Sequence, residues 1–583
     1  MSAQIEKTSL ESPGQVGTRR MKRYSSIDFA RGLAIFMMVW LHTFMRWFDQ
    51  DRIVADITNG TAPLFLVVLM AVSLFFGSWA GFFLMVSAIG NMISMARGLE
   101  RGQSAADLAL KQVIGGMLLL VFAYLTESLT GYHGAIGELA KGSTNWLNPF
   151  WYRGYHMETI HTVAWCVILN GIVQGLLSMK GGFKKFSRNI KIYAILAIAV
   201  IAVTQLVWWG FDAMVPNGDF SHGTNPLTGH PWQYGDLRKL DFFTNFLLVF
   251  VQPWAGQVEP LFPFLAVSFI GSMIGLYLVK PRTGDEGKNT KTLRISMAGG
   301  FTLMVGMFVV VLAILLLRPG DPIDGLLNVL RKAYDVTDIE QYGVWLPWFL
   351  MVTGGQWGAI CLLLRLVEFR GKSAPFARKT LLFRRFGFVA FSIYNYQFLD
   401  VLPVMLTALL LGMPAWPLPS FYTTTIWLAL ALIIVTWAVV LWLWEKTSYA
   451  FGLEWLIAKI SGLIIPSKRR ERKAEGTPRL PWWKTERLDP QGALHDAEWI
   501  NIVDEKDIDH ANLKDSKLAF KLTMTGWIFF PGFFVGLALS RESRKTEGIN
   551  WANKAASIVS IIGIIWVAAF ITITLILTTG LLF

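Results

Sequence analysis

The sequence predicts an all-α polytopic helical membrane protein with about ten transmembrane helices in a core and two more at the C-terminus. Of its 583 residues, 54% are hydrophobic and only 16% are charged, whereas soluble globular chains carry about a quarter charged residues. The apolar residues come in blocks, many of which reach the roughly 20 residues that a helix needs to cross a bilayer. The 25 tryptophans suit the interfacial belts of such proteins, where an amphipathic ring lies at the level of the headgroups.

The distribution of charged residues narrows the class of protein further. The net charge is +13, but the lysines and arginines gather in loops between apolar blocks, as positive-inside topology requires. We therefore expect membrane lipid, and no nucleic acid, among the partners. Cys166 and Cys361 lie inside apolar blocks, and no paired-cysteine or H-E-x-x-H spacing occurs, so we expect no disulfide framework and no metal.

The crossings follow in order along the chain. A polar, basic tail (1–24) precedes a transmembrane core (25–466), whose first crossing is expected at about 27–47. The further crossings are expected at about 63–96, 112–130, 159–178, 190–211, 260–280, 296–318, 343–369, 386–411 and 421–444. The centre of 63–96, "FFGSWAGFF", favours a bend, and 242–257 is expected to be half-buried or re-entrant. Basic loops at 97–111, 180–191, 280–294 and 370–385 predict that these loops and the N-terminus are cytoplasmic.

The C-terminal part is organised differently. The segment "SYAFGLEWLIAKISGLIIP" predicts an interfacial helix, and 467–518 reads as a polar cytoplasmic linker. A membrane extension (519–583) would then cross at about 520–540 and 553–583, and it could dock a second copy or a partner subunit. Its loop "RESRKTEGINWANK" would lie outside despite its positive charge, so a hairpin that does not span fully is the alternative.

The first crossing, "SSIDFARGLAIFMMVWLHTFMRW", carries the residues that suggest chemistry. His42 lies 14 positions after Asp28, which is about 21 Å along a helix axis, so Asp28 and Arg31 are expected near one face and His42 toward the other. Ionisable groups at membrane depth are costly and usually face a polar cavity or a partner. A topogenic arginine and a helix-end histidine that only packs is the alternative, but the three residues together favour a functional site.

Several segments resemble the transmembrane acyltransferase superfamily. "RYSSIDFARGLAIFMMVWLH" is similar to its first helix, R-x-x-S-L/I-D-x-x-R-G-L-A followed by an apolar run that ends in His. "GSWAGFFLMVSAIGNMISMARG", "METIHTVAWCVILNGIVQGLL" and "EPLFPFLAVSFIGSMIGLYL" resemble later helices of the group. "FGFVAFSIYNYQFLDVL" and "FGLEWLIAKI" resemble signatures of its YeiB-type members. The resemblance covers about residues 20–466 and includes acyltransferase family 3 and heparan-α-glucosaminide N-acetyltransferase-like proteins.

The resemblance implies an acyltransferase in a membrane, which we expect to be a prokaryotic cell membrane. It would move an acyl group, with acetyl-CoA as the expected donor, from cytoplasmic acyl-CoA to a hydroxyl or amine of an extracytoplasmic glycan or glycolipid. His42 would be the general base, oriented by a carboxylate as in a catalytic triad. The expected catalytic residues are His42, Asp28, Arg31, Glu127, His161 and Glu158, with Asp49, Asp51 and Asp56 as further candidates to orient His42. The expected acyl-CoA-binding residues are Arg31, Arg97, Arg101 and Ser87.

Two other functions stay open. In a small-solute transporter, the same intramembrane polar residues would line the path of the solute. In a non-catalytic structural subunit, Arg31 and His42 would only pack, and Arg97 and Arg101 would only set topology. Polar residues elsewhere in the crossings also have packing interpretations; they are Asn170, Gln174, Tyr394, Asn395 and Gln397.

Overall fold

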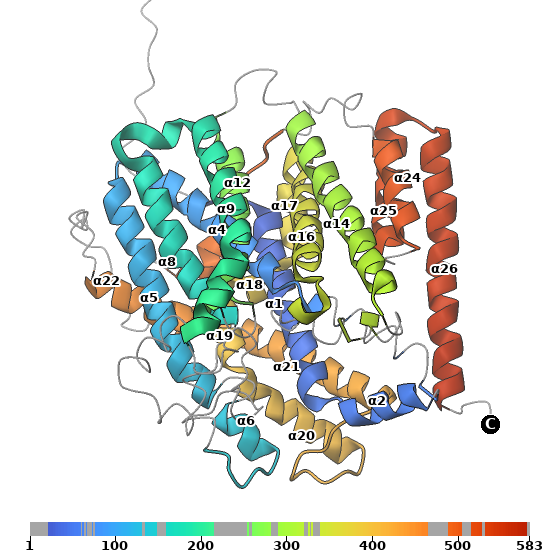
Figure 1. Cartoon of the computed structure of the whole chain (residues 1–583). Helices are drawn as coiled ribbons and strands as arrows, with labels where there is room; N and C mark the ends of the chain where they lie inside the picture. Colours follow the sequence, from blue (N-terminus) through green and yellow to red (C-terminus); the bar gives the residue numbers. More distant parts are fainter. Residues whose placement is uncertain are drawn as a thin grey trace, which may run out of the picture.

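The computed structural model describes residues 21–59, 61–62, 66, 73, 76–130, 134–147, 159–214, 253–255, 259–281, 290–319, 325–326, 328–329, 339–464, 485, 488–503, 515–527 and 531–579. Ten helices in this part of the chain are long and apolar enough to cross a membrane, and most stand side by side (Figure 1). The predicted all-α polytopic fold is confirmed. The segment expected to be re-entrant, 242–257, lies outside the described residues except for 253–255.

The long helices match most of the expected crossings. They are α1 (Ser25–Trp47), α4 (Ala80–Glu100), α5 (Ala105–Leu129), α8 (Thr159–Ser178), α9 (Phe186–Met214), α12 (Leu261–Val279), α14 (Lys291–Leu317), α16 (Trp345–Leu366), α21 (Thr424–Lys446) and α26 (Trp551–Thr579). We call the side on which α1 begins the α1-start face and the opposite side the α1-end face. The bend expected in "FFGSWAGFF" is present, because a turn at Ser78–Trp79 precedes α4.

Shorter elements lie between and around these helices. At the α1-end face are α2 (Gln50–Thr58), α6 (Ala135–Ala140) and η3 (Glu340–Tyr342), while η2 (Met179–Lys184) and η4 (Glu368–Arg370) lie at the α1-start face. The segment between α16 and α21 contains α17 (Ser373–Lys379), α18 (Leu381–Phe388), α19 (Ala390–Asn395), η5 (Gln397–Asp400) and α20 (Val401–Leu410). Next come α22 (Leu453–Ile464), η6 (Gln491–His495), α24 (Asp515–Thr525) and α25 (Pro531–Glu547).

One predicted crossing is present, but it is not the single helix that we expected. We expected a single helix over 386–411, but the chain passes from the α1-start face to the α1-end face as α18, α19, η5 and α20. The breaks fall at Val389 and Tyr396, whose backbone angles are not those of an α-helix (φ −123°, ψ 45° and φ −105°, ψ 27°). A broken helix exposes backbone polar groups, which in a membrane must be satisfied inside the protein. The buried side chains Ser392, Asn395 and Gln397 lie at this break.

α1 and α18 cross at very short range, which fixes the broken crossing against the first helix. Gly32 on α1 and Gly387 on α18 face each other, and a Cβ atom on Gly387 would lie 2.7 Å from the Gly32 nitrogen. A Cβ atom on Gly32 would overlap the Phe383 carbonyl. Small residues of this kind let two helix backbones approach closely in a membrane. The "RGLA" segment of α1 therefore has a packing role at its glycine.

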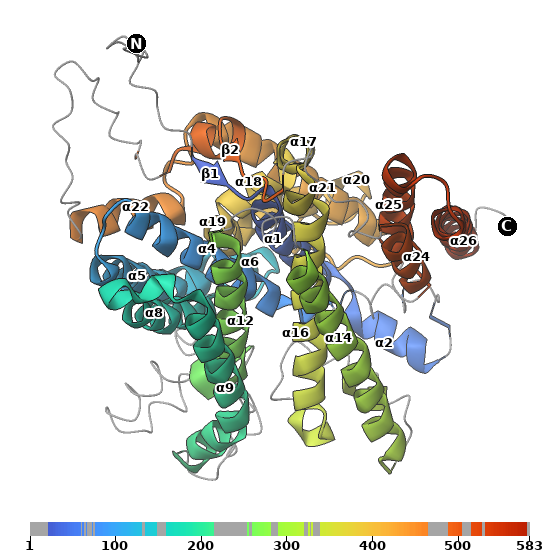
Figure 2. The same cartoon turned by 90° about the horizontal axis from the view of Figure 1, so that it is seen from above.

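The C-terminal extension does not form the two crossings that we expected. Residues 520–540 belong to two antiparallel helices, α24 and α25, in which Gly536 lies against Thr523 and the Glu547 carboxylate accepts from the Ser516 backbone N–H at 3.3 Å. Both outer ends of this hairpin therefore lie on the α1-start face, and α26 alone crosses beside it (Figures 1 and 2). The basic loop after α25 consequently stays with the other basic loops. This arrangement is the alternative that the positive-inside pattern suggested.

Part of the predicted polar linker is ordered on the α1-start face. Residues 488–503, which we call the strap, include η6 and β2 (Glu498–Trp499), and β2 pairs in parallel with β1 (Lys22–Arg23). The Ser373 hydroxyl donates to the Ile500 carbonyl at 2.7 Å. The Ile502 backbone N–H donates to the Glu368 carbonyl at 2.9 Å. The strap thus joins the start of α1 to the end of α16.

Candidate functional site

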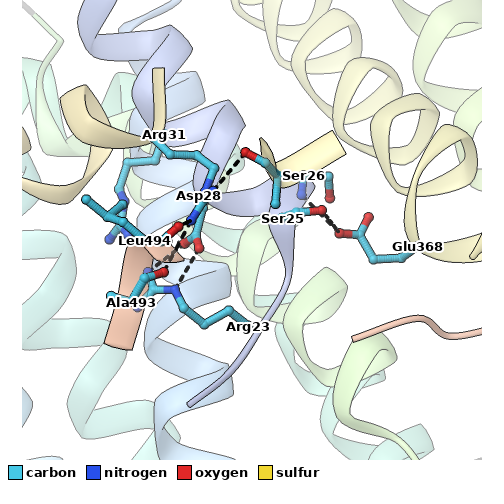
Figure 3. A network of polar contacts seen from close by, with 10 residues as sticks. Arg23, Ser25, Ser26, Asp28, Arg31, Glu368, Ala493 and Leu494 are labelled. Atoms are coloured by element: carbon cyan, nitrogen blue, oxygen red, sulfur yellow. Dashed lines mark hydrogen bonds and ion pairs between the residues drawn. The ribbon is translucent and has the colours of Figure 1, made fainter. Parts of the chain in front are cut away.

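A cluster of charged side chains surrounds the first turn of α1 (Figure 3). The Asp28 carboxylate accepts two hydrogen bonds from Arg23, from Nε at 2.7 Å and from Nη2 at 2.8 Å, and a longer one from Arg31 Nη2 at 3.4 Å. The Asp28 side chain is 12% exposed, whereas that of Arg31 is 33% exposed. The Nε atom of Arg31 has no hydrogen-bond partner among the described residues. That Nε atom is buried, so Arg31 has an unused donor inside the cluster, while another part of its side chain is accessible from outside.

Two more arginines add positive charge to this cluster. Arg384 on α18 and Arg97 on α4 both interact electrostatically with Asp28. The Arg384 guanidinium donates to the Ala377 carbonyl at 2.8 Å and to the Leu494 carbonyl of the strap at 2.7 Å. Burial lowers its pKa to about 10, so it stays protonated at neutral pH. The four arginines of this cluster interact with three carboxylates, Asp28, Glu445 and Glu454, so the cations are in excess and this end of α1 attracts anions.

The predicted acyl-CoA-binding residues lie along α4 and near the start of α1. Arg97 is partly buried and Arg101 is exposed, both at the α1-start face. Ser87 is half-buried on the same helix, ten residues before Arg97, which is about 15 Å along the axis. Arg31 and Arg97 therefore belong to one cationic cluster, and Ser87 lies deeper in the membrane.

The start of α1 is fixed by a buried carboxylate that the sequence did not suggest. The Glu368 side chain accepts from the Ser26 backbone N–H at 2.9 Å and from the Ser25 hydroxyl at 3.4 Å. The first N–H groups of a helix have no partner inside it, and Glu368 supplies one. Because Glu368 is fully buried, this cap holds α1 in one position relative to α16.

His42 lies in the other half of α1 and contacts the broken crossing. Its Nδ1 atom is 2.7 Å from Gln397 Oε1, and its ring meets that of Tyr394 edge to face at 6.1 Å. The Gln397 amide nitrogen donates to Met38 Sδ at 3.3 Å, which turns Oε1 toward His42. An amide oxygen can only accept, so Nδ1 carries a hydrogen in this contact. In the neutral ring the lone pair is then on Nε2, which is the tautomer that a general base needs.

Among the described side chains, the partner of His42 Nδ1 is not a carboxylate, and the expected role of Glu127 stays a prediction because its side chain is not described. The Nδ1 atom pairs with an amide, Gln397, 355 positions away in the chain. Asp56 instead accepts from the Tyr422 hydroxyl at 2.6 Å, and Asp49 accepts from the Arg52 backbone N–H at 3.0 Å. Asp51 is exposed at the start of α2, and the side chain of Glu127 lies outside the described residues. Asp28 binds arginines near the start of α1, about 21 Å from His42 along the helix.

Glu454 holds the break in place from α22. Its carboxylate accepts from the Phe391 backbone N–H at 2.7 Å and from the backbone N–H and hydroxyl of Ser392. The Ser392 hydroxyl oxygen in turn accepts from the Leu453 backbone N–H at 2.8 Å. Burial raises the pKa of Glu454, and its charge also acts on Arg31. The "SIYNYQ" and "FGLEW" segments therefore contact each other, and the first of them contacts His42.

A second polar pair continues the seam between α1 and the broken crossing. Arg46 lies one turn after His42 on α1, and Asp400 lies one turn after Gln397 on the other side. The Asp400 carboxylate accepts from Trp437 Nε1 at 2.8 Å and interacts electrostatically with Arg46. Both charged side chains are buried. Sequence reasoning did not select Asp400 or Glu454, although each is a carboxylate next to an apolar segment, which is the signal that could have found them.

The expected pairing of His161 with Glu158 stays a prediction, but the structure shows other neighbours of His161. Its ring is fully buried and meets the Tyr124 ring edge to face at 4.7 Å. Glu158, its expected partner, lies outside the described residues. The buried carboxylate near this turn of α8 is Glu259, which accepts from the Thr159 hydroxyl, and its carbonyl accepts from Thr162 at 2.6 Å.

The amide side chains on α8 serve helix packing. Asn170 Nδ2 donates to the Ser268 hydroxyl at 2.9 Å and to the Ser272 hydroxyl at 2.8 Å, both on α12. The Gln174 side-chain oxygen accepts from Gln112 on α5 at 2.8 Å. These contacts join three long helices, so the packing interpretation of Asn170 and Gln174 accounts for their positions.

No group of three or more potential metal ligands occurs among the described residues. Comparison with known proteins finds no family model and no curated protein that matches this sequence. The candidate site therefore rests on its own geometry: a cationic cluster at the start of α1, and a histidine with a defined hydrogen-bond partner farther along the same helix.

Proposed function

We propose that this protein is a membrane acyltransferase that uses acyl-CoA, with acetyl-CoA as the first donor to test. The observation that carries the proposal is that α1 holds different polar groups in its two halves. Arg31, in a cationic cluster, and His42, paired with Gln397, lie 11 residues apart on one helix, which is about 16 Å along its axis. That spacing suits a donor with anionic phosphates at one end and a reactive thioester at the end of an extended arm.

The cationic cluster has the donor set that phosphates require. The Arg31 side chain is one-third exposed and its contact with Asp28 is long, at 3.4 Å. Guanidinium groups bind phosphate oxygens through charge-assisted hydrogen bonds, so Arg31 and Arg97 would hold the phosphates. We propose that the α1-start face is cytoplasmic, because the basic loops lie there and acyl-CoA is a cytoplasmic metabolite.

The chemistry follows from the tautomer of His42. A bound thioester supplies an electrophilic carbonyl carbon and a thiolate leaving group. Nε2 of His42 takes the proton from an acceptor hydroxyl or amine as the acceptor atom bonds to that carbon. When the carbon–sulfur bond breaks, the imidazolium returns the proton to the departing sulfur. Gln397 Oε1 accepts the Nδ1–H throughout, so it fixes the ring and favours its protonated form.

The acceptor is proposed to be a glycan or glycolipid on the α1-end face, toward which α1 carries His42. This assignment rests on the resemblance of the first helix to the acyltransferase superfamily. The loop 215–243 supports it through its mixture of aromatic, amide and carboxylate residues, although the loop lies outside the described residues. Such a mixture is typical of sugar-binding surfaces.

The test is acyl transfer and thioester hydrolysis by the purified protein in detergent with labelled acetyl-CoA. We expect turnover in the wild type and a loss of about 10²-fold or more in His42→Ala, which is the usual range for a general base. Because Cys166 and Cys361 are buried, the released CoA thiol can be followed with a thiol reagent. His495→Ala is the matched control, since His495 contacts Glu445 at the α1-start face. Equal turnover in His42→Ala and wild type would refute the proposal.

A further inference from the structure

The C-terminal unit, α24 to α26, turns its acidic side chains inward. Asp515 receives an ion pair from Arg370, and Glu542 is 3.1 Å from Arg370 Nη1. Glu547 accepts from the backbone and side chain of Ser516 on α24. These three are all the carboxylates between residues 515 and 554. Each is therefore neutralised or bonded inside the protein.

The basic side chains of the same unit point outward. Six of them are exposed: Lys517, Lys521, Arg541, Arg544, Lys545 and Lys554. None forms an ion pair with another described residue, and Arg544 alone has a side-chain hydrogen bond, to the Ser557 hydroxyl at 2.7 Å. Asp515 is buried, and Glu542 and Glu547 are only partly exposed and already bonded, so positive charge predominates on the outer surface of the unit.

Exposed apolar side chains lie next to this basic surface and farther along the same helices, toward the interior of the membrane. Ile549, in the loop before α26, and Trp551, the first residue of α26, are 70% and 65% exposed. Farther from the α1-start face, Met524, Trp527 and Phe534 are exposed on the hairpin. Most of the cations lie within about two turns of the outer helix ends. Cations and an aromatic ring at one level, with apolar side chains below, are the arrangement of a surface in contact with lipid.

We propose that α24, α25 and the start of α26 bind anionic phospholipid headgroups at the α1-start face. Each basic side chain near an anionic membrane surface favours binding by roughly fivefold. A free phosphate would use the cations alone, whereas a phospholipid also covers the apolar side chains beneath them. Bound lipid would lie against a unit that is fastened to the end of α16 through Arg370. The inference is independent of the proposed acyl transfer.

The test measures which lipid gathers beside the unit. The full-length protein with Ile549→Cys carries a donor fluorophore there, since Cys166 and Cys361 are buried. The labelled protein is placed in phosphatidylcholine vesicles. These vesicles contain either acceptor-labelled phosphatidylglycerol or acceptor-labelled phosphatidylcholine. We expect energy transfer from the donor to show several-fold enrichment of phosphatidylglycerol over phosphatidylcholine. High salt should abolish the enrichment, because it screens exposed charges.

Two variants with the same chemical change locate the effect. The first neutralises the proposed surface with Lys517→Gln, Lys521→Gln, Lys545→Gln and Lys554→Gln. The second neutralises four exposed lysines at the same face, in η2, directly after it and near the start of α9, with Lys180→Gln, Lys184→Gln, Lys185→Gln and Lys191→Gln. We expect the first variant to lose the enrichment and the second to retain it.

Three results would overturn the inference. Equal transfer to both lipids in the wild type would mean that the cations only set topology. Equal loss of enrichment in both variants would mean that general surface charge is responsible. Displacement of the labelled lipid by excess inorganic phosphate at constant ionic strength would identify a free anion site. If the first variant fails to fold, the wild-type lipid comparison and its salt dependence still decide.

Discussion

The close crossing of α1 and α18 makes a quantitative prediction for Gly32→Ala. An added methyl group at Gly32 would overlap the Phe383 carbonyl and would lie 3.1 Å from the Gly387 nitrogen. Both neighbours are backbone atoms, which cannot rotate away as a flexible side chain can. The two helices must therefore separate, and the contacts along their crossing weaken.

The magnitude follows from two opposing effects. Overpacking a well-packed contact by a methyl group typically costs about 1–3 kcal/mol, and more where the backbone must move. Alanine improves helix propensity over glycine by about 1 kcal/mol. We therefore expect Gly32→Ala to reduce the free energy of unfolding by about 1–2 kcal/mol. The break that holds Gln397 follows α18 directly, so the His42–Gln397 distance should lengthen as well.

The assay is thermal unfolding of the purified protein in detergent, with Gly90→Ala as the control. Gly90 lies in α4, and nothing lies within 4 Å of the position of an added Cβ atom. We expect Gly32→Ala to unfold about 1–2 °C below the wild type, given the size of the chain, and Gly90→Ala to unfold at or above it. Equal unfolding temperatures for the two variants would refute the close crossing.

Three further predictions test other contacts. Arg370→Ala should destabilise the protein by about 1–3 kcal/mol in a denaturant titration, because the buried Asp515 then keeps Arg365, at 3.5 Å, as its only cation among the described residues; an effect below about 1 kcal/mol would contradict this. Glu454 has a raised pKa, so its contribution to stability should fall as pH rises from about 4.5 through that raised value. Glu454→Gln should therefore flatten the dependence of the unfolding temperature on pH, and an unchanged slope would count against the burial of this carboxyl. Gln397→Leu should reduce acyl transfer nearly as much as His42→Ala while leaving acyl-CoA binding intact, as equilibrium binding of labelled acetyl-CoA would measure.

Much of the architecture was predictable because the bilayer imposes it on the sequence. A crossing must be apolar over roughly 20 residues, so α1, α12 and α16 are visible as blocks of sequence. Glycine and tryptophan in "FFGSWAGFF" indicated the turn that precedes α4. The basic loop after α25 argued for a hairpin before the structure showed one, because positive charge and membrane side are coupled.

The errors occurred where one segment alone holds too little information. Residues 386–411 are apolar enough for one helix, yet Glu454, some sixty residues later, binds the backbone at Phe391 and Ser392 and stabilises a break. Residues 520–540 are apolar enough to cross, but Gly536 packs against Thr523 and folds them into a hairpin. Hydropathy registers the cost of exposing a segment to lipid or water, and it does not register which distant group satisfies a broken backbone.

The same distinction between local sequence and distant contacts applies to the candidate site. The sequence by itself determined that Asp28, Arg31 and His42 share one membrane helix, and that they lie at its two ends, since helical rise fixes their spacing. Only the tertiary structure decided their partners: Arg23 for Asp28, and Gln397 for His42 across 355 positions of chain. A hydrogen bond between residues so far apart exists because two helices pack side by side. That packing depends on every crossing at once, and so no local pattern records it.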